Sequence, residues 1–202
     1  MTGKPKYLKD FDALHRSDPQ FSHIDELESE LYANPSDRAV AVVFGSFVES
    51  ALRSLLQKQF RPDLNSDDRG ALFGFEGPMG PFSSKILMAY GMGLLGPTSR
   101  HDLDLIRHLR NGFAHSRIPF KFTTPEVRSV CDQFKIVELD ATPIPHGYLN
   151  RVPHEQRQEA TDRNHPKTRF ITTCHHLSYR MMVKRDGPKA GDYVFPNDEP
   201  LP

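Results

Sequence analysis

The chain has 202 residues, of which 37% are hydrophobic and 17 are proline, so it fits one domain of ordinary size with irregular connections. Its 26 acidic and 26 basic residues balance. This neutrality disfavours a protein that reads DNA by itself, because phosphate contacts supply most of such affinity. The two cysteines, Cys131 and Cys174, form no CxxC pair, which favours a reducing compartment. With no apolar signal core and no run of about 20 apolar residues, we expect a cytoplasmic protein that does not span a membrane.

The predicted elements begin after a polar stretch, residues 1–20, that we expect to be flexible. A short helix is expected over about 22–34. The strongest pattern follows over about 36–60, where apolar residues recur at three- and four-residue spacing and Glu49 lies on the polar side. An Arg-Pro pair then ends this helix, and residues 61–80 are expected to form a loop.

The next predicted helix covers about residues 83–95 and contains two glycines, Gly91 and Gly93. A glycine inside a helix costs about 1 kcal/mol against alanine. Helical glycines often permit close backbone approach, so we expect a tight helix crossing at these two positions.

Further helices are predicted toward the C-terminus. The third main helix, counted from the one over residues 36–60, should run over about 98–116. We expect it to be capped by the threonine or serine at its start, with support from Asp102. A fourth is expected over about 125–134, with proline at its first position. Residues 136–166 are expected to be mostly loop, and a last helix should cover about 167–184.

These patterns together predict an all-α fold, a helical bundle of four to five main helices with long irregular loops and extended termini. The expected organisation is a flexible N-terminal segment over residues 1–20, one helical domain over residues 21–185, and an extended tail over residues 186–202.

Two segments resemble a known family: GPMGPFSSKILMAYGMGLLG, residues 77–96, and HDLDLIRHLRNGFAHS, residues 101–116. A Gly-Pro-small-Gly loop, a helix ending in Tyr-Gly-x-Gly and a helix ending in Arg-Asn-x-x-Ala-His resemble the mannitol-repressor family (MltR, also written MtlR). The last motif also resembles the Arg-x4-His signature of HEPN-like helical proteins. The resemblance covers about 76–134 closely and 36–60 more loosely. It implies a helical bundle that usually forms dimers, and HEPN-like relatives include both metal-independent ribonucleases and non-catalytic members.

Arg110, Asn111 and His115 are the candidate catalytic residues if the chain is such a ribonuclease. His115 would exchange protons with the 2′-hydroxyl or the leaving oxygen, and Arg110 would stabilise charge on the phosphate. Arg110 and His115 lie about 140° apart on an ideal helix. Both can therefore act together only if the helix unwinds at Gly112 or if two copies form the site across a symmetric interface. Glu49 is placed to position Arg110.

A structural interpretation of the same residues stays open. Arg110 would pair with Glu49 or with an acid of a partner subunit, while Asn111 and His115 would satisfy carbonyls at the helix end. Arg107 and His108, on the same helix, complete the candidate binding or interface set together with Glu49 and Arg110.

Neither a metal nor a cofactor is expected. His101, His108 and His115 lie seven residues apart and so share one helical stripe with Asp104, but no further ligand occurs at convincing spacing. Cys174 falls on the apolar stripe of the last helix, which favours a place in the core.

The resemblance and the neutral charge favour a non-enzymatic role. We expect an MltR-like regulatory protein of the repressor type that acts through protein–protein contacts and has no DNA-reading motif of its own. Two alternatives stay open, a HEPN-type metal-independent endoribonuclease with a composite dimer site and an assembly module of a stress or defence system. A homodimer through helices that include the third, and a protein partner, are expected. RNA is the partner of the ribonuclease alternative, and direct sequence-specific DNA binding is not expected.

Overall fold

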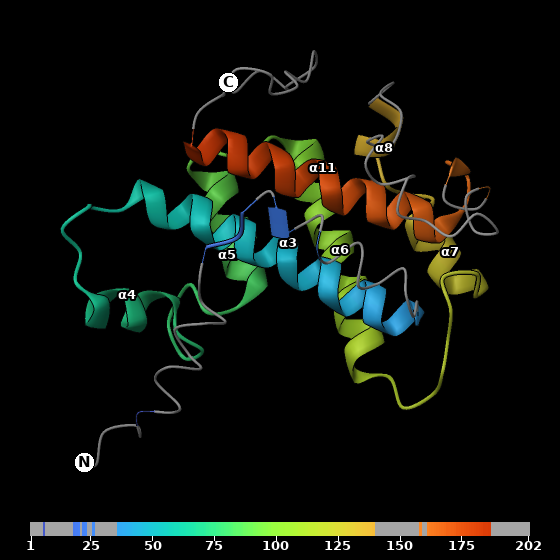
Figure 1. Ribbon diagram of the computed structural model, residues 1–202, viewed down its shortest axis with the longest axis horizontal. Coiled ribbons are helices and arrows are strands. Elements are labelled where there is room, and N and C mark those ends of the chain that lie inside the picture. The colour runs from blue at the N-terminus through green and yellow to red at the C-terminus, as the bar shows by residue number, and fades with distance from the viewer. Residues whose placement is uncertain are drawn as a thin grey trace.

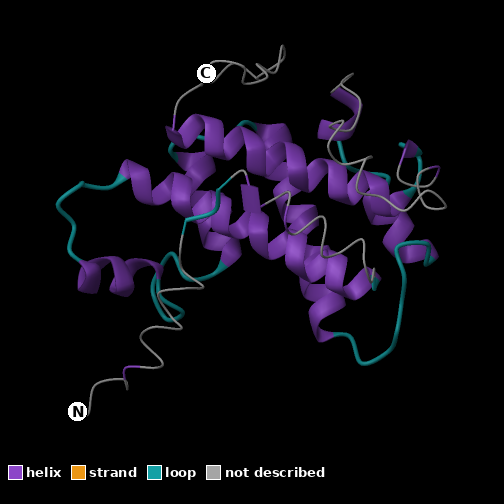
Figure 2. Cartoon of the chain, in the orientation of Figure 1, coloured by secondary structure: helices purple, strands orange, loops and turns teal. Residues whose placement is uncertain are grey.

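The computed structural model describes residues 36–139 and 161–186, together with a few isolated residues, namely Lys6, 18–20, 22–23, Glu26 and Gln158. Throughout this described part, every regular element is a helix, which confirms the all-α prediction (Figure 2). The predicted N-terminal segment and short helix, most of the 136–166 connection and the tail after Asp186 fall largely outside the described residues.

The central element is α3 (Asp37–Gln59), and α11 (Pro166–Asp186) lies along it (Figure 1). Ser36 caps α3 by accepting a hydrogen bond from the backbone N–H of Ala39 at 3.0 Å, as the sequence pattern predicts. Helix α11 buries the predicted stripe of Phe170, Cys174, Leu177 and Met181. The two longest helices therefore agree with the sequence expectation and supply nearly half of the buried hydrophobic residues.

Two further helices pack on α3, and both differ in detail from the prediction. Helix α5 (Phe82–Gly91) ends before the expected residue 95, because Gly93 has a φ of +69° and the chain turns there. A Cβ added at Gly91 or Gly93 would meet nothing within 4 Å, so the predicted tight crossing at these glycines is wrong. Helix α6 (Pro97–His115) begins with proline at its first position after Gly96, without the predicted side-chain cap.

Three short helices complete the described fold. Helix α4 (Ser66–Phe73) occupies the stretch predicted to be a loop, because the Asn65 side chain caps it by accepting from the Asp68 N–H at 2.8 Å. Helix α7 (Pro125–Cys131) begins with proline as predicted but stops early. A separate helix, α8 (Ile136–Leu139), then occupies the first residues of the predicted loop.

Aromatic rings fix the segment between α6 and α7 onto the core. Phe113 of α6 lies 4.6 Å from Phe120 and 4.9 Å from Phe122, measured between ring centroids. Phe122 in turn lies 5.2 Å from Phe170 of α11. Aromatic pairs at such distances contribute about 1 kcal/mol each beyond the area they bury. The C-terminal end of α6, which carries the Arg-Asn-x-x-Ala-His motif, is therefore held against α11 by packed rings.

Within the described part, α3 is the one helix long and apolar enough to cross a membrane by length and composition alone. The sequence-based expectation that no stretch has the length and apolar composition of a membrane span is therefore wrong. More than half of the apolar window is buried against other elements, and α3 packs against α5, α6 and α11. A central core helix passes the same test, and we interpret α3 as one.

Candidate functional site

A cluster of charged side chains lies where α3, α5 and α6 meet. The Glu49 carboxylate of α3 accepts from Lys85 Nζ of α5 at 2.8 Å through one oxygen and from Arg110 Nη2 of α6 through the other. Lys85 Nζ also donates to the Gly80 carbonyl at 2.6 Å. One carboxylate therefore ties together three helices, and the loop before α5 is tied to the same lysine.

Lys85 is the most buried member of this cluster, with a side chain only 4% exposed. Burial lowers the pKa of Lys85 from its usual value, and the hydrogen bond and charge of Glu49 oppose that effect. A buried ammonium without such a partner would cost several kcal/mol. Glu49 is therefore the group that allows a charge to sit beneath α5.

Arg110 is held in place by shape as well as by charge. A Cβ added at Gly45 of α3 would lie 2.8 Å from both Cβ and Cγ of Arg110, so only glycine fits at this helix crossing. The guanidinium lies 5.7 Å from the centre of the Phe82 ring, and Nη1 donates to Asn111 Oδ1 at 2.9 Å. The close helix approach expected at α5 thus occurs between α3 and α6.

His115 lies apart from the Arg110 cluster. It is the last residue of α6 and is exposed, whereas the Arg110 side chain is 22% exposed and turned toward α3 and α5. Among the described residues, no hydrogen bond or ion pair joins His115 to Arg110, Asn111 or Glu49. The structure brings Glu49, Arg110 and Asn111 together, as the structural interpretation expects for Glu49 and Arg110, but it does not add His115 to them within one chain.

Arg107 and His108 lie on the outward side of α6. Arg107 contacts Asp104 at 3.3 Å, and His108 Nδ1 lies 2.7 Å from the Asp104 carbonyl oxygen. His108 is exposed, and the Arg107 side chain is 23% exposed. An ion pair between side chains three residues apart on one helix contributes about 0.2–0.5 kcal/mol. These side chains can therefore rearrange toward a partner at small cost.

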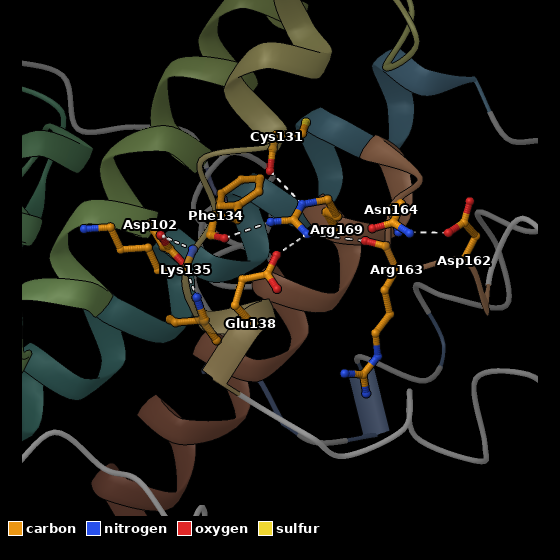
Figure 3. A network of polar contacts seen from close by, with 10 residues as sticks. Asp102, Cys131, Phe134, Lys135, Glu138, Asp162, Arg163, Asn164 and Arg169 are labelled. Atoms are coloured by element: carbon orange, nitrogen blue, oxygen red, sulfur yellow. Dashed lines mark hydrogen bonds and ion pairs between the residues drawn. The ribbon is translucent and has the colours of Figure 1, made fainter.

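A second polar network joins the end of α7 to α6 and α11 (Figure 3). Asp102, fully buried in α6, accepts from the backbone N–H of Lys135 at 3.0 Å and of Ile136 at 2.8 Å. Arg169 of α11 donates to the carbonyls of Cys131 and Phe134 at 3.0 and 2.9 Å. The prediction that Asp102 supports the α6 cap is wrong, because its carboxylate caps α8 instead.

Both cysteines lie in the core, where they are poorly placed to act as nucleophiles or metal ligands. Cys131 and Cys174 are both buried, and burial raises the pKa of the Cys131 thiol to about 12 and that of Cys174 well above its usual value. Such thiols stay protonated and unreactive at neutral pH. Across the described residues, no group of three or more His, Cys, Asp or Glu side chains is placed to hold a metal ion.

Sequence reasoning missed Lys85, Gly45 and Gly80 as members of the Glu49 cluster. One signal was available, since Lys85 is the single charged residue between positions 77 and 99. A lone charge in an otherwise uncharged helix requires a partner if it is buried. The partner, Glu49, lies 36 residues away in the sequence and could not be assigned from spacing.

The described part of the chain thus defines an all-helical bundle in which a partly buried carboxylate connects three helices. No protein-family model and no curated protein matches the chain. A solved structure does match, a chain in the X-ray structure of the MtlR-HPr complex from Escherichia coli. The TM-score is 0.57 at 18% identity, covering 79% of this chain and 98% of that one. At this identity the likeness is one of fold, and it supports an MtlR-like fold for this chain.

Proposed function

We propose that this chain is an MtlR-like regulatory protein that acts by binding another protein. The observation that carries the proposal is the likeness in fold to a chain from the MtlR-HPr complex. The neutral overall charge agrees with action through protein contact rather than through direct DNA reading. HPr is accordingly the first partner protein to test.

The outward side of α6 is the surface we assign to this partner. It carries Arg107 and His108, whose contacts to Asp104 are local to α6 and hold no other helix. Reversible interfaces have polar rims whose charges guide encounter and select the partner. A charged surface that the fold does not need for its own packing is suited to that role.

The geometry gives less support to the ribonuclease alternative. Arg110 would have to bind phosphate, but its guanidinium already contacts Glu49, Asn111 and the Phe82 ring. To bind a phosphate, Arg110 would have to give up its ion pair with Glu49. We therefore propose structural positioning as the role of Arg110.

Isothermal titration calorimetry of the full chain with HPr tests the proposal. We expect micromolar binding, and the double variant Arg107→Ala, His108→Ala should weaken it about 10-fold, equivalent to about 1.4 kcal/mol. Arg61→Ala is the matched control, because Arg61 also forms an exposed ion pair, with Asp63, but lies outside α6. Its affinity for HPr should equal that of the unchanged chain.

Two results would contradict this function. One is nanomolar, sequence-specific DNA binding by the isolated chain with a steep salt dependence. The other is RNA cleavage in EDTA that is lost in both Arg110→Ala and His115→Ala, because that result would establish the enzyme instead.

A further inference from the structure

A cavity of about 620 Å³ lies at the end of the bundle where α3 and α11 both terminate (Figure 1). Cavities of about 300–1,000 Å³ are the usual size for small-molecule sites. The walls come from four parts of the chain that are distant in the sequence, namely residues 18–20, the C-terminal end of α3, the segment that leads into α4, and the C-terminal end of α11. The cavity shares no lining residue with the Glu49 cluster or with the outward side of α6.

Arg185, at the end of α11, builds one wall of the cavity. Its side chain is only 8% exposed, and Nη1 donates to Ser54 Oγ of α3 at 2.9 Å and to the Pro19 carbonyl at 3.2 Å. The buried Ser54 hydroxyl donates in turn to Asp18 Oδ1 at 2.9 Å. A nearly buried guanidinium therefore holds residues 18–20 against two helix ends. A wall fixed in this way costs a ligand little to order.

The lining of the cavity suits a polar molecule. Eight of the ten lining residues are polar or charged, and only Phe60 and Pro62 are apolar. An apolar molecule would leave those polar groups buried without partners, at a cost in binding free energy. The Gln57 side chain makes no hydrogen bond with another described residue, and its amide can both donate and accept. Hydroxyl groups also do both, so a hydroxylated molecule matches this wall.

Two cations in the cavity have no carboxylate partner within the described chain. Lys58, in the last turn of α3, is exposed, and its ammonium forms no ion pair there. Arg69 of α4 donates only to backbone carbonyls, from Nε to Leu64 at 2.9 Å and from Nη2 to Pro62 at 3.4 Å. Guanidinium and ammonium groups are the usual partners of phosphate and carboxylate. The two cations therefore favour a ligand with an anionic group.

The ends of α3 and α11 act against an anion, because each carries about half a negative charge. The last turns of the two helices contain three basic residues, Lys58, Lys184 and Arg185. Arg185 is neutralised by Asp186, which accepts from its Nε at 2.7 Å. The other two outweigh the two helix ends, and Arg69 balances Asp18. The surroundings of the cavity therefore keep a positive excess.

We propose that this cavity binds a small hydroxylated anion, a phosphate ester or a carboxylate. Lys58 and Arg69 hold the anionic group, while Gln57 and the second carboxylate oxygen of Asp18 bind hydroxyl groups. The ligand thereby fastens residues 18–20 and α4 to the ends of α3 and α11. The proposal goes beyond the proposed function and does not depend on it, because it uses no residue of the surface assigned to HPr.

Isothermal titration calorimetry of the full chain with three related probes tests the site. Glucose 6-phosphate, gluconate and glucose share a six-carbon hydroxylated body and differ in their anionic group. At least one of the two anions should bind with a dissociation constant of about 1 mM or tighter, and glucose should bind about 10-fold more weakly or not at all. The tighter of the two anions identifies the anionic group as phosphate or carboxylate.

Lys58→Gln is the variant that locates the binding. Its side chain supports no other described residue, so the variant should fold, and circular dichroism melting checks this. We expect the affinity for the anion to fall about 10-fold, because a charged hydrogen bond is lost. Lys121→Gln is the matched control, since Lys121 is also exposed and lies outside the cavity. It should bind as the unchanged chain does.

Hydrogen exchange measured by mass spectrometry gives a second readout. Phe73 is the single buried residue of α4, so this helix depends on few contacts for its place. A ligand held by Arg69 should slow amide exchange in α4, and Lys58→Gln should lose this protection at the same anion concentration. The outward side of α6 should exchange at an unchanged rate.

Three results would each overturn the proposal: no saturable binding of either anion up to about 10 mM, glucose binding as tightly as the anions, or an anion affinity that Lys58→Gln leaves unchanged. Failure of the proposed function is a separate outcome. A chain that binds the anion but never HPr keeps this site and loses that partner. A chain that binds HPr but neither anion keeps the partner and loses the site.

Discussion

Helices α5 and α6 are neighbours with opposite designs. Helix α6 follows the usual rule, because Leu103, Ile106 and Phe113 are buried while Arg107 and His108 face outward. Helix α5 departs from the rule in part, because it buries Lys85 beside Ile86 and Ala89 and exposes Leu87. The difference shows that burial of a charge is tolerated where another helix supplies its counterion. It also places an exposed apolar surface on α5 beside a charged surface on α6.

The largest expected effect comes from removing the counterion beneath α5. Glu49→Gln leaves Lys85 and Arg110 as neighbouring cations, so we expect a loss of about 3 kcal/mol in the free energy of unfolding. Urea denaturation measures it. Glu126→Gln, at an exposed carboxylate of α7, is the control and should change little. A loss below about 0.5 kcal/mol for Glu49→Gln would show that the buried charge needs no partner.

A smaller effect is expected at the crossing of α3 and α6. Gly45→Ala places a Cβ 2.8 Å from Arg110, and the resulting overpacking should cost about 2 kcal/mol in unfolding free energy. Gly70→Ala, within α4, is a matched control with nothing within 4 Å of its Cβ. It should be neutral or stabilise by up to about 1 kcal/mol, because alanine is the better helix former. Equal effects at both positions would exclude a steric role for Gly45.

The pH dependence of stability can isolate Lys85. Because the pKa of Lys85 is lowered in the folded chain, the unfolded chain binds more protons in the window just below the usual value of 10.5. Stability of the unchanged chain relative to Lys85→Met should therefore rise with pH through that window. Paired chemical denaturation of both proteins at several alkaline pH values measures the difference. A relative stability that falls as the pH rises would mean that Glu49 raises the pKa of Lys85 by more than burial lowers it.

The smallest effect is expected on the outward side of α6. Arg107→Ala removes contacts to Asp104 and His108 within the same helix, so the free energy of unfolding should change by less than about 0.5 kcal/mol. Thermal and urea denaturation check this value. A loss above about 1 kcal/mol would mean that Arg107 serves the fold, and the surface assigned to a partner would have to move.

The fold was predictable where periodicity is strong and local. The apolar spacing of α3, the stripe of α11 and the proline at the start of α7 each identify a helix from neighbouring residues. Helix α4 was missed because its eight residues are too polar and too short to show a period, although the capping pair of Asn65 and Asp68 marks its start.

The candidate site was only partly predictable, because its contacts join distant positions. The pairing of Glu49 with Arg110 was among the alternatives that the sequence left open, and it spans 61 residues. Asp102 was misassigned because a capping pattern lay close to it in the sequence, while the two backbone N–H groups that it accepts from lie 33 and 34 residues away. Single-sequence reasoning identifies groups that need partners and cannot choose between distant partners for them.

The fit between Gly45 and Arg110 has a consequence for comparing distant homologues. Position 45 cannot gain a side chain unless position 110 loses one, and a neutral residue at 49 would require a neutral residue at 85. Because Arg110 also contacts Glu49, these four positions should covary as one coupled set across chains that share the fold. At identities near the 18% seen with the solved structure, such coupled substitutions would test whether another chain shares this packing of α3, α5 and α6.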